Sequence, residues 1–139
     1  MKQIDEACIR KTNESNIKFE EKKSKIIFQN PKRDTFYCIQ VDGCAIKTGV
    51  KCDNMLTNDE GLEFYIELKG CDVDHAIIQL EETIKKLSED YRSWPKKAFI
   101  ISTRQPAIDV KIQNAKKRFQ KNYNTELLVR NTPYNYLMR

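Results

Sequence analysis

A change of hydrophobic period at Gly70 constrains the fold of this 139-residue chain more than any other feature. In "FYIELK" at 64–69, the apolar residues Phe64, Ile66 and Leu68 stand at alternate positions, which is typical of a strand. In the following "DVDHAIIQLEETIKKLSEDY", apolar residues recur every three or four positions, which is the period of an amphipathic helix. The sequence therefore predicts a strand that leads directly into a helix.

Two further extended runs precede this strand. They are "TFYCIQVDGCAIK" at 35–47 and "VKCDNML" at 50–56, and the short turn sequences "TG" and "TNDEG" separate the runs from each other and from the strand. Short connections between neighbouring strands favour antiparallel pairing. We therefore predict a meander of three strands.

The remaining elements favour an α/β fold. The sequence predicts a helix at 2–13, a strand in "KSKIIFQN", a turn in "NPKRD" and a buried strand in "AFIIST". Asp72 or Asp74 caps the helix after the meander, and Pro106 opens another helix before a last strand in "ELLVR" and a tail at 131–139. This order predicts an αβββαβ sandwich, in which helices flank a mixed central sheet, plus a C-terminal helix and strand.

Composition indicates one globular domain over residues 1–139. The chain is 40% hydrophobic and 32% charged, and no apolar run is long enough to span a bilayer. The N-terminal "MKQIDEACIRK" carries acids where a signal peptide needs an apolar stretch, so we expect a cytoplasmic protein with no membrane partner. The net charge of +5 permits binding to a polyanion but does not establish it.

The cysteines predict no metal centre. There are five of them without any C-x-x-C spacing, and His75 is the one histidine of the chain. A structural zinc site needs more such ligands at closer spacing. Several cysteines lie in strand-like runs, where a free thiol behaves as a small apolar group, so we expect all five to be reduced.

The register of the meander gathers polar residues on one face. If Leu56 pairs with Leu62 across the turn, Asp53 faces Tyr65, and Cys44 faces Asp53 if Lys47 pairs with Val50. Side chains two residues apart share a face of a strand. This register puts four polar side chains on one face: Asp42, Asp53, Glu67 and Lys69. It puts the apolar side chains on the other face as core: Ile39, Val41, Leu56, Phe64, Ile66 and Leu68.

Such a face has the chemistry for phosphodiester hydrolysis. Two carboxylates on neighbouring strands repel each other unless a cation lies between them. Oxygen ligands with few other donors suit Mg²⁺, which keeps several waters and binds substrate phosphate. A lysine beside the cation can orient a water and offset the charge that develops on the phosphate.

Asp53, followed on the next strand by Glu67-Leu68-Lys69, resembles the PD-(D/E)XK nuclease superfamily over the element order of residues 1–103. The resemblance implies an αβββαβ core, a divalent-metal site for Mg²⁺ in which Mn²⁺ substitutes, and cleavage of DNA. It assigns Asp53 and Glu67 as metal ligands and Lys69 as the catalytic lysine. Many members carry a glutamine on the helix after the third strand, and Gln79 occupies that place.

Further residues complete the expected site. Many members of the superfamily carry a glutamate on the first helix, where Glu6, Glu14, Glu20 and Glu21 compete and we favour Glu20. Asp42 acts either as an additional ligand or as a turn residue, because Asp-Gly is a turn signal. Two basic residues of "NPKRD" either hold DNA phosphate or cover the turn: Lys32 and Arg33.

The expected function is that of a small Mg²⁺-dependent endodeoxyribonuclease. A chain of 139 residues leaves little room for a separate sequence-reading domain. Selectivity would then come from DNA structure, a homodimer or a larger protein partner, as in repair, junction resolution, restriction or defence. The main alternative is a non-catalytic interaction subunit that keeps the nuclease fold, and a third is an unrelated α/β binding protein.

Overall fold

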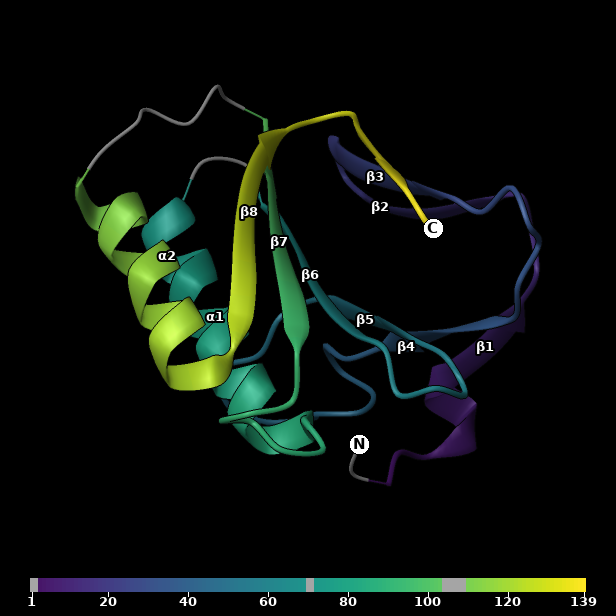
Figure 1. Cartoon of the computed structure of the whole chain (residues 1–139), viewed down its shortest axis with the longest axis horizontal. Coiled ribbons are helices and arrows are strands. Elements are labelled where there is room, and N and C mark those ends of the chain that lie inside the picture. The colour runs from purple at the N-terminus through teal and green to yellow at the C-terminus, as the bar shows by residue number, and fades with distance from the viewer. Residues whose placement is uncertain (1–2, 70–71, 104–109) are drawn as a thin grey trace.

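The computed structural model describes residues 3–69, 72–103 and 110–139, which form two sheets and two α-helices (Figure 1). The larger sheet has six strands, in the spatial order β1 (Ile9–Thr12), β4 (Phe36–Gln40), β5 (Asn54–Thr57), β6 (Glu63–Lys69), β7 (Lys96–Ser102) and β8 (Thr125–Asn131). The smaller sheet has three, in the order β2 (Asn16–Glu21), β3 (Ser24–Gln29) and β9 (Tyr134–Leu137). The helices are α1 (Val73–Leu87) and α2 (Val110–Tyr123).

The large sheet is mixed, which confirms the predicted α/β class. Strands β4, β5 and β6 form the expected antiparallel meander, and β1 pairs antiparallel with β4. Strands β6, β7 and β8 are parallel, because α1 and α2 return the chain to the same end of the sheet after β6 and β7. The sheet therefore changes from antiparallel to parallel pairing at β6.

Both helices lie over one face of the large sheet (Figure 1). Helix α1 begins after Asp72, whose Oδ1 accepts a 3.0 Å hydrogen bond from the N–H of His75, so Asp72 is the cap and Asp74 is not. The predicted apolar stripe of α1 is buried against β6 and β7. The predicted start of the second helix at Pro106 lies outside the described residues; within them, α2 buries Ile112, Ala115 and Phe119 as expected.

The other face of the large sheet is covered by the small sheet, not by a helix. Phe28 of β3 packs edge-to-face on Phe99 of β7, with ring centroids 5.4 Å apart, and Tyr136 of β9 contacts both rings. The expected C-terminal tail is thus strand β9, which pairs in parallel with β3. Because both faces of the large sheet are buried, the prediction of one core face and one polar face was wrong.

The predicted N-terminal helix is absent among the described residues. Asp5 caps a single 3₁₀ turn, η1 (Glu6–Cys8), and β1 follows it at once. The helical interpretation rested on the spacing of Ile4, Ala7 and Cys8. Pairing with β4 outweighs that short local pattern, because β1 supplies a complete ladder of four residue pairs and contains the β-branched Ile9 and Thr12.

The register of the meander differs from the expected one. Leu56 pairs with Phe64 and not with Leu62, so the loop between β5 and β6 is longer by two residues on the β6 side. A shift of two preserves the face of every side chain of β6. The register between β4 and β5 differs from the expected one by an odd number of residues, because Gln40 pairs with Asn54. Ile39 and Val41 therefore pack on the helix side of the sheet, away from Leu56.

The expectation of five reduced cysteines was wrong. Cys8 and Cys44 form a disulfide that joins the 3₁₀ turn to the loop after β4. Cys44 does not pair with Asp53, because the backbone N–H of Val41 donates to the carbonyl of Asp53 over 3.0 Å. Cys38 and Cys52 are free and buried, as expected for small apolar side chains, and Cys71 lies outside the described residues.

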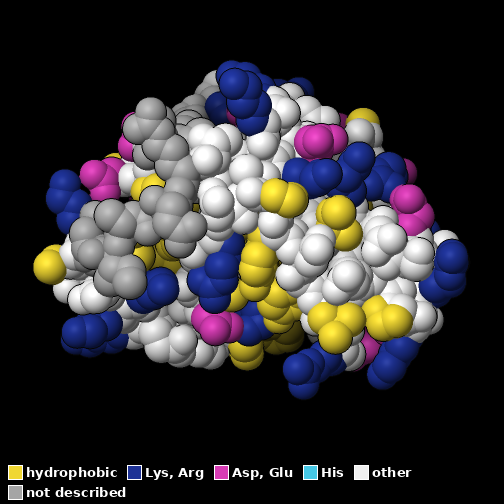
Figure 2. All heavy atoms as spheres, turned by 90° about the horizontal axis from the view of Figure 1, so that it is seen from above, with side chains coloured by type: hydrophobic (Ala, Val, Ile, Leu, Met, Phe, Trp, Pro, Cys, Tyr) yellow, Lys and Arg dark blue, Asp and Glu magenta, His cyan; other side chains and the backbone are white. Residues whose placement is uncertain are grey.

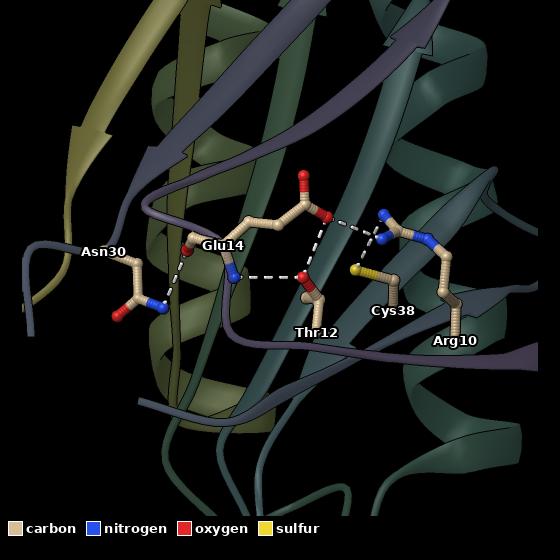
Figure 3. A network of polar contacts seen from close by, with 5 residues as sticks. All are labelled: Arg10, Thr12, Glu14, Asn30 and Cys38. Carbon is tan, nitrogen blue, oxygen red and sulfur yellow. Dashed lines mark hydrogen bonds and ion pairs between the residues drawn. The ribbon is translucent and has the colours of Figure 1, made fainter. Parts of the chain in front are cut away.

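A polar network fixes the corner at which the chain passes from the large sheet to the small one (Figure 3). Glu14 accepts hydrogen bonds at Oε1 from Thr12 Oγ1 (2.9 Å) and from Arg10 (3.0 Å). Asn30, which is buried at the end of β3, donates from Nδ2 to the carbonyls of Glu14 (3.0 Å) and Asp34 (2.9 Å). These bonds hold the base of the β2–β3 hairpin against the large sheet.

Neither helix in the described part of the chain is both long and apolar enough to cross a membrane.

Candidate active site

A cleft of about 460 Å³ opens where the end of β6, the start of β5 and the tip of the β2–β3 hairpin meet beside α1. Figure 2 looks down on the end of the molecule at which the hairpin tip lies, and it shows acidic and basic side chains next to each other on this surface. Of the residues that the structure describes, ten line the cleft: Glu21, Lys22, Lys23, Ser24, Asp42, Asp53, Glu67, Leu68, Gln79 and Thr103.

Asp53 and Glu67 lie together in this cleft. Each stands one residue beyond the Asn54–Ile66 pair of the β5–β6 ladder. The backbone N–H of Asp53 donates to Glu67 Oε1 over 3.1 Å, and the N–H of Leu68 donates to Asp53 Oδ2 over 2.8 Å. The two residues are only 8% and 1% exposed, so they are not members of a solvated surface strand.

The electrostatic surroundings favour the protonated form of Asp53. Burial raises its pKa to about 6, and the nearby acids Glu21 and Asp42 act in the same direction. The hydrogen bond from Leu68 N–H opposes this effect without cancelling it. The cleft therefore concentrates negative charge around a carboxyl group that water solvates poorly.

Glu21, not Glu20, is the N-terminal glutamate of this cleft. A hydrogen bond between the carboxyl groups of Glu21 and Asp53 contributes to the raised pKa of Asp53. Glu20 lies outside the cleft lining, and its Oε1 is 3.5 Å from Lys18 Nζ. The alternation of β2 explains the difference, because Glu21 belongs to the same face as the buried Ile17 and Phe19. The sequence "NIKFEE" contains this alternation, and it identifies Glu21 once the segment is assigned as a strand.

Helix α1 holds the segment that carries Asp53. Gln79 Nε2 donates to the carbonyl of Lys51 (3.0 Å), and the N–H of Cys52 donates to Thr83 Oγ1 (2.7 Å). Thr83 is fully buried and also donates to the carbonyl of Gln79 (2.8 Å). Gln79 Oε1 is buried and has no hydrogen-bond partner among the described residues, although its side chain lines the cleft. Gln79 therefore positions Asp53 and leaves one acceptor unused.

Asp42 lies at the cleft as a third neighbour of Asp53. Its backbone N–H donates to the carbonyl of Asp53 (3.3 Å), and its Oδ1 is 3.7 Å from Lys51 Nζ. Gly43 follows it with a φ of 76°, a conformation that glycine adopts without strain. Asp42 therefore belongs to a turn and also lines the cleft.

Three predicted site residues remain: Lys69, Lys32 and Arg33. Lys69 is the last residue of β6, where its backbone pairs with Ser102, and its side chain lies outside the described part of the structure. Lys32 and Arg33 are exposed in the turn after β3, whereas the cleft lies at the start of β3. A six-residue strand is about 20 Å long, so these two residues are remote from the carboxylates.

The donor set fits a hard cation. Across residues 3–69, 72–103 and 110–139, no three His, Cys, Asp or Glu side chains are already arranged around one metal position. The cleft nevertheless offers the carboxylate oxygens of Asp53, Glu67 and Glu21 and the unused amide oxygen of Gln79. Oxygen donors without thiolate or imidazole suit Mg²⁺ or Mn²⁺.

Comparisons of the chain with protein-family models, curated proteins and solved structures give no match. A functional interpretation therefore depends on the geometry of the cleft.

Proposed function

We propose that this protein is a metal-dependent phosphodiesterase that hydrolyses DNA, with Mg²⁺ as its natural cation and Mn²⁺ as a substitute. The observation that supports the proposal is the pair of buried carboxylates, Asp53 and Glu67, joined by the 3.1 Å bond from Asp53 N–H. A chain that only needed solubility would place such groups on its surface.

The surroundings of Asp53 call for a compensating cation. Other buried ionisable groups of this protein have clear partners: Glu63, for example, accepts from Tyr65 Oη (2.7 Å) and from the N–H of Glu89 (3.0 Å). Asp53 instead has Glu21 and Asp42 as neighbours, and they raise its pKa. A divalent cation would remove this repulsion and allow all the carboxylates to stay ionised.

Each residue then has a distinct task. Asp53 and Glu67 would hold the cation, with Glu21 as a further oxygen donor, and Mg²⁺ would supply a Lewis acid for the phosphate oxygens. The hydrogen bonds from Leu68 N–H and from Gln79 fix the direction of the Asp53 carboxylate and its backbone. The unused Gln79 Oε1 would accept a hydrogen bond from the attacking water and so orient it. Lys69 keeps the role proposed from the sequence, which is to offset charge on the phosphate.

One observation favours the non-catalytic alternative. The carboxyl groups of Asp53 and Glu21 share a hydrogen bond, so a proton can take the place of a cation between them. A subunit that has this fold but does not cleave DNA would keep the cleft in that protonated state.

Cleavage assays separate the two functions. Purified protein would be incubated with single-stranded, duplex and branched DNA in Mg²⁺, Mn²⁺ or EDTA. We expect cleavage in either metal and none in EDTA, and we expect Lys69→Ala to abolish cleavage without lowering the urea midpoint. Cleavage that persists in EDTA would contradict the proposal, as would an absence of cleavage on all three DNA forms in both metals.

A further inference from the structure

The tip of the β2–β3 hairpin brings two adjacent lysines to the cleft. Lys22 and Lys23 form the turn between Glu21 and Ser24, which are the last paired residues of the hairpin. Both lysines are exposed, and both line the same cleft as Asp53 and Glu67. One cleft therefore contains acids that suit a cation and ammonium groups that suit an anion.

The ammonium groups of Lys22 and Lys23 form no ion pair within the described part of the chain. Among the described residues, neither Lys22 Nζ nor Lys23 Nζ has a carboxylate oxygen within 4.0 Å. The neighbouring Glu21 directs its carboxyl group to Asp53 instead. Several other lysines of this protein do form ion pairs, for example Lys97 with Glu126. The charges of Lys22 and Lys23 are thus available to a ligand.

Contacts at both ends hold the hairpin in place. At the tip, Thr132 Oγ1 accepts a 2.9 Å hydrogen bond from Lys25 N–H and donates over 3.5 Å to the carbonyl of Lys23. Strand β9, which begins two residues after Thr132, pairs with β3 along the hairpin. At the base, Asn30 ties the hairpin to Glu14 (Figure 3). The backbone that carries the two lysines is therefore fixed in advance, and binding of an anion needs to order only their side chains.

The backbone at the tip is unusual for a lysine. Lys22 has a φ of 52°, in the left-handed region that favours glycine or asparagine. A lysine at this position gains no conformational advantage. The fold alone does not explain a lysine at position 22, whereas a role in the cleft that Lys22 lines does explain it.

We propose that Lys22 and Lys23 bind the phosphodiester backbone of a nucleic-acid strand and hold it beside the carboxylates of the cleft. This inference rests on the proposed function, because it assigns the substrate contacts of the same site. A phosphate that approaches Asp53 and Glu67 meets negative charge, so cations are needed both among the carboxylates and on the rim. The hairpin tip supplies the rim cations.

The test compares two double variants with the same loss of charge. Lys22→Asn/Lys23→Gln removes the hairpin lysines, and asparagine tolerates the left-handed backbone at position 22. Lys116→Gln/Lys117→Gln is the control, because these adjacent lysines are exposed on α2, outside the cleft lining. Binding of a labelled oligonucleotide is measured by fluorescence anisotropy in Ca²⁺, which occupies oxygen sites without supporting turnover.

We expect the hairpin variant to bind about tenfold or more weakly, since two phosphate contacts are lost. The slope of log K against log salt should fall by about 1.5–2, at roughly 0.9 per contact with duplex DNA. The control should change neither quantity by a comparable amount, and both variants should keep the wild-type urea midpoint. Equal affinities for the two variants, or no binding of the oligonucleotide by the wild-type protein, would overturn the inference.

A second arm identifies the source of the phosphate. A mononucleotide and inorganic phosphate are added as competitors, and we expect neither to displace the oligonucleotide at millimolar concentration. Displacement by either would overturn the strand as ligand and assign the lysines to a free phosphate compound. Failure of the proposed function looks different: the wild-type protein would bind the oligonucleotide through the hairpin yet not cleave it in Mg²⁺ or Mn²⁺.

Discussion

The backbone N–H of Asp53 donates to the carboxylate of Glu67, at the point where the β5–β6 ladder ends. This bond joins two of the acids of the cleft across neighbouring strands. It orients the Glu67 side chain, and the bond from Leu68 N–H orients Asp53 in return. The reciprocal arrangement explains how two buried carboxylates keep a fixed geometry, which a cation site requires.

The first prediction concerns the pH dependence of metal binding. The pKa of Asp53 is raised to about 6, so a proton competes with the metal below that pH. Affinity for Mn²⁺ should fall by up to about tenfold for each pH unit below 6 and become constant above about pH 7. Titrations between pH 5 and 8 measure this change. A constant affinity across that range would show that Asp53 is not a ligand.

The second prediction concerns stability without metal. Folded Asp53 binds a proton between its ordinary pKa of 3.8 and the raised value of about 6, whereas the unfolded chain does not. Its contribution to the free energy of unfolding is therefore greatest below this window and is lost as pH rises through it. Asp53→Asn should be more stable than the wild-type protein at pH 7.5, by about 1 kcal/mol, and this gain should shrink at pH 4. Urea midpoints of both proteins, measured in EDTA at pH 4 and at pH 7.5, test this prediction. A lower midpoint for Asp53→Asn than for the wild-type protein at pH 7.5 would refute it.

The third prediction uses adjacent glutamates as a matched pair. Glu21→Gln removes a carboxylate from the cleft, whereas Glu20→Gln removes one that lies outside its lining. We expect the first change to lower the cleavage rate at least tenfold and the second to leave it within about twofold. Single-turnover cleavage in Mg²⁺ compares them. Similar rates for the two variants would remove Glu21 from the site.

The fourth prediction concerns the disulfide. Cys8 and Cys44 are separated by 36 positions, and cross-linking them restricts the unfolded chain. Cys8→Ser/Cys44→Ser should lower the free energy of unfolding by about 2–4 kcal/mol. Urea unfolding of the wild-type protein with and without reductant should show a loss of similar size. If the midpoint does not respond to reductant, the cross-link does not stabilise the protein.

The sequence predicts the strands and helix around the site well, and the reason is local. The alternation in "FYIELK" and the stripe in α1 each extend over enough residues to specify an element, and a two-residue error in register leaves Glu67 on its face. Two of the failures involve pairing between distant segments. Strand β1 pairs with β4, and β9 pairs with β3 more than 100 residues earlier in the chain.

The same reason explains which site residues were missed. Glu21 and the two hairpin lysines enter the cleft only because residues 16–29 form a hairpin on the second face of the sheet. Without a strand assigned to residues 16–21, the sequence gives no basis for choosing Glu21 over Glu20. The alternation of Ile17 and Phe19 identifies the correct glutamate once the segment is recognised as a strand.

The most direct test of the metal site is a titration of the protein with Mn²⁺ at pH 7.5. Electron paramagnetic resonance monitors the titration and gives the number of bound ions. The account predicts that the wild-type protein and Glu20→Gln bind Mn²⁺ in the cleft, and that Asp53→Asn and Glu67→Gln lose this binding while they remain folded. Wild-type protein that binds no Mn²⁺, or variants that bind it as well as wild type, would contradict the claim that Asp53 and Glu67 form a metal site.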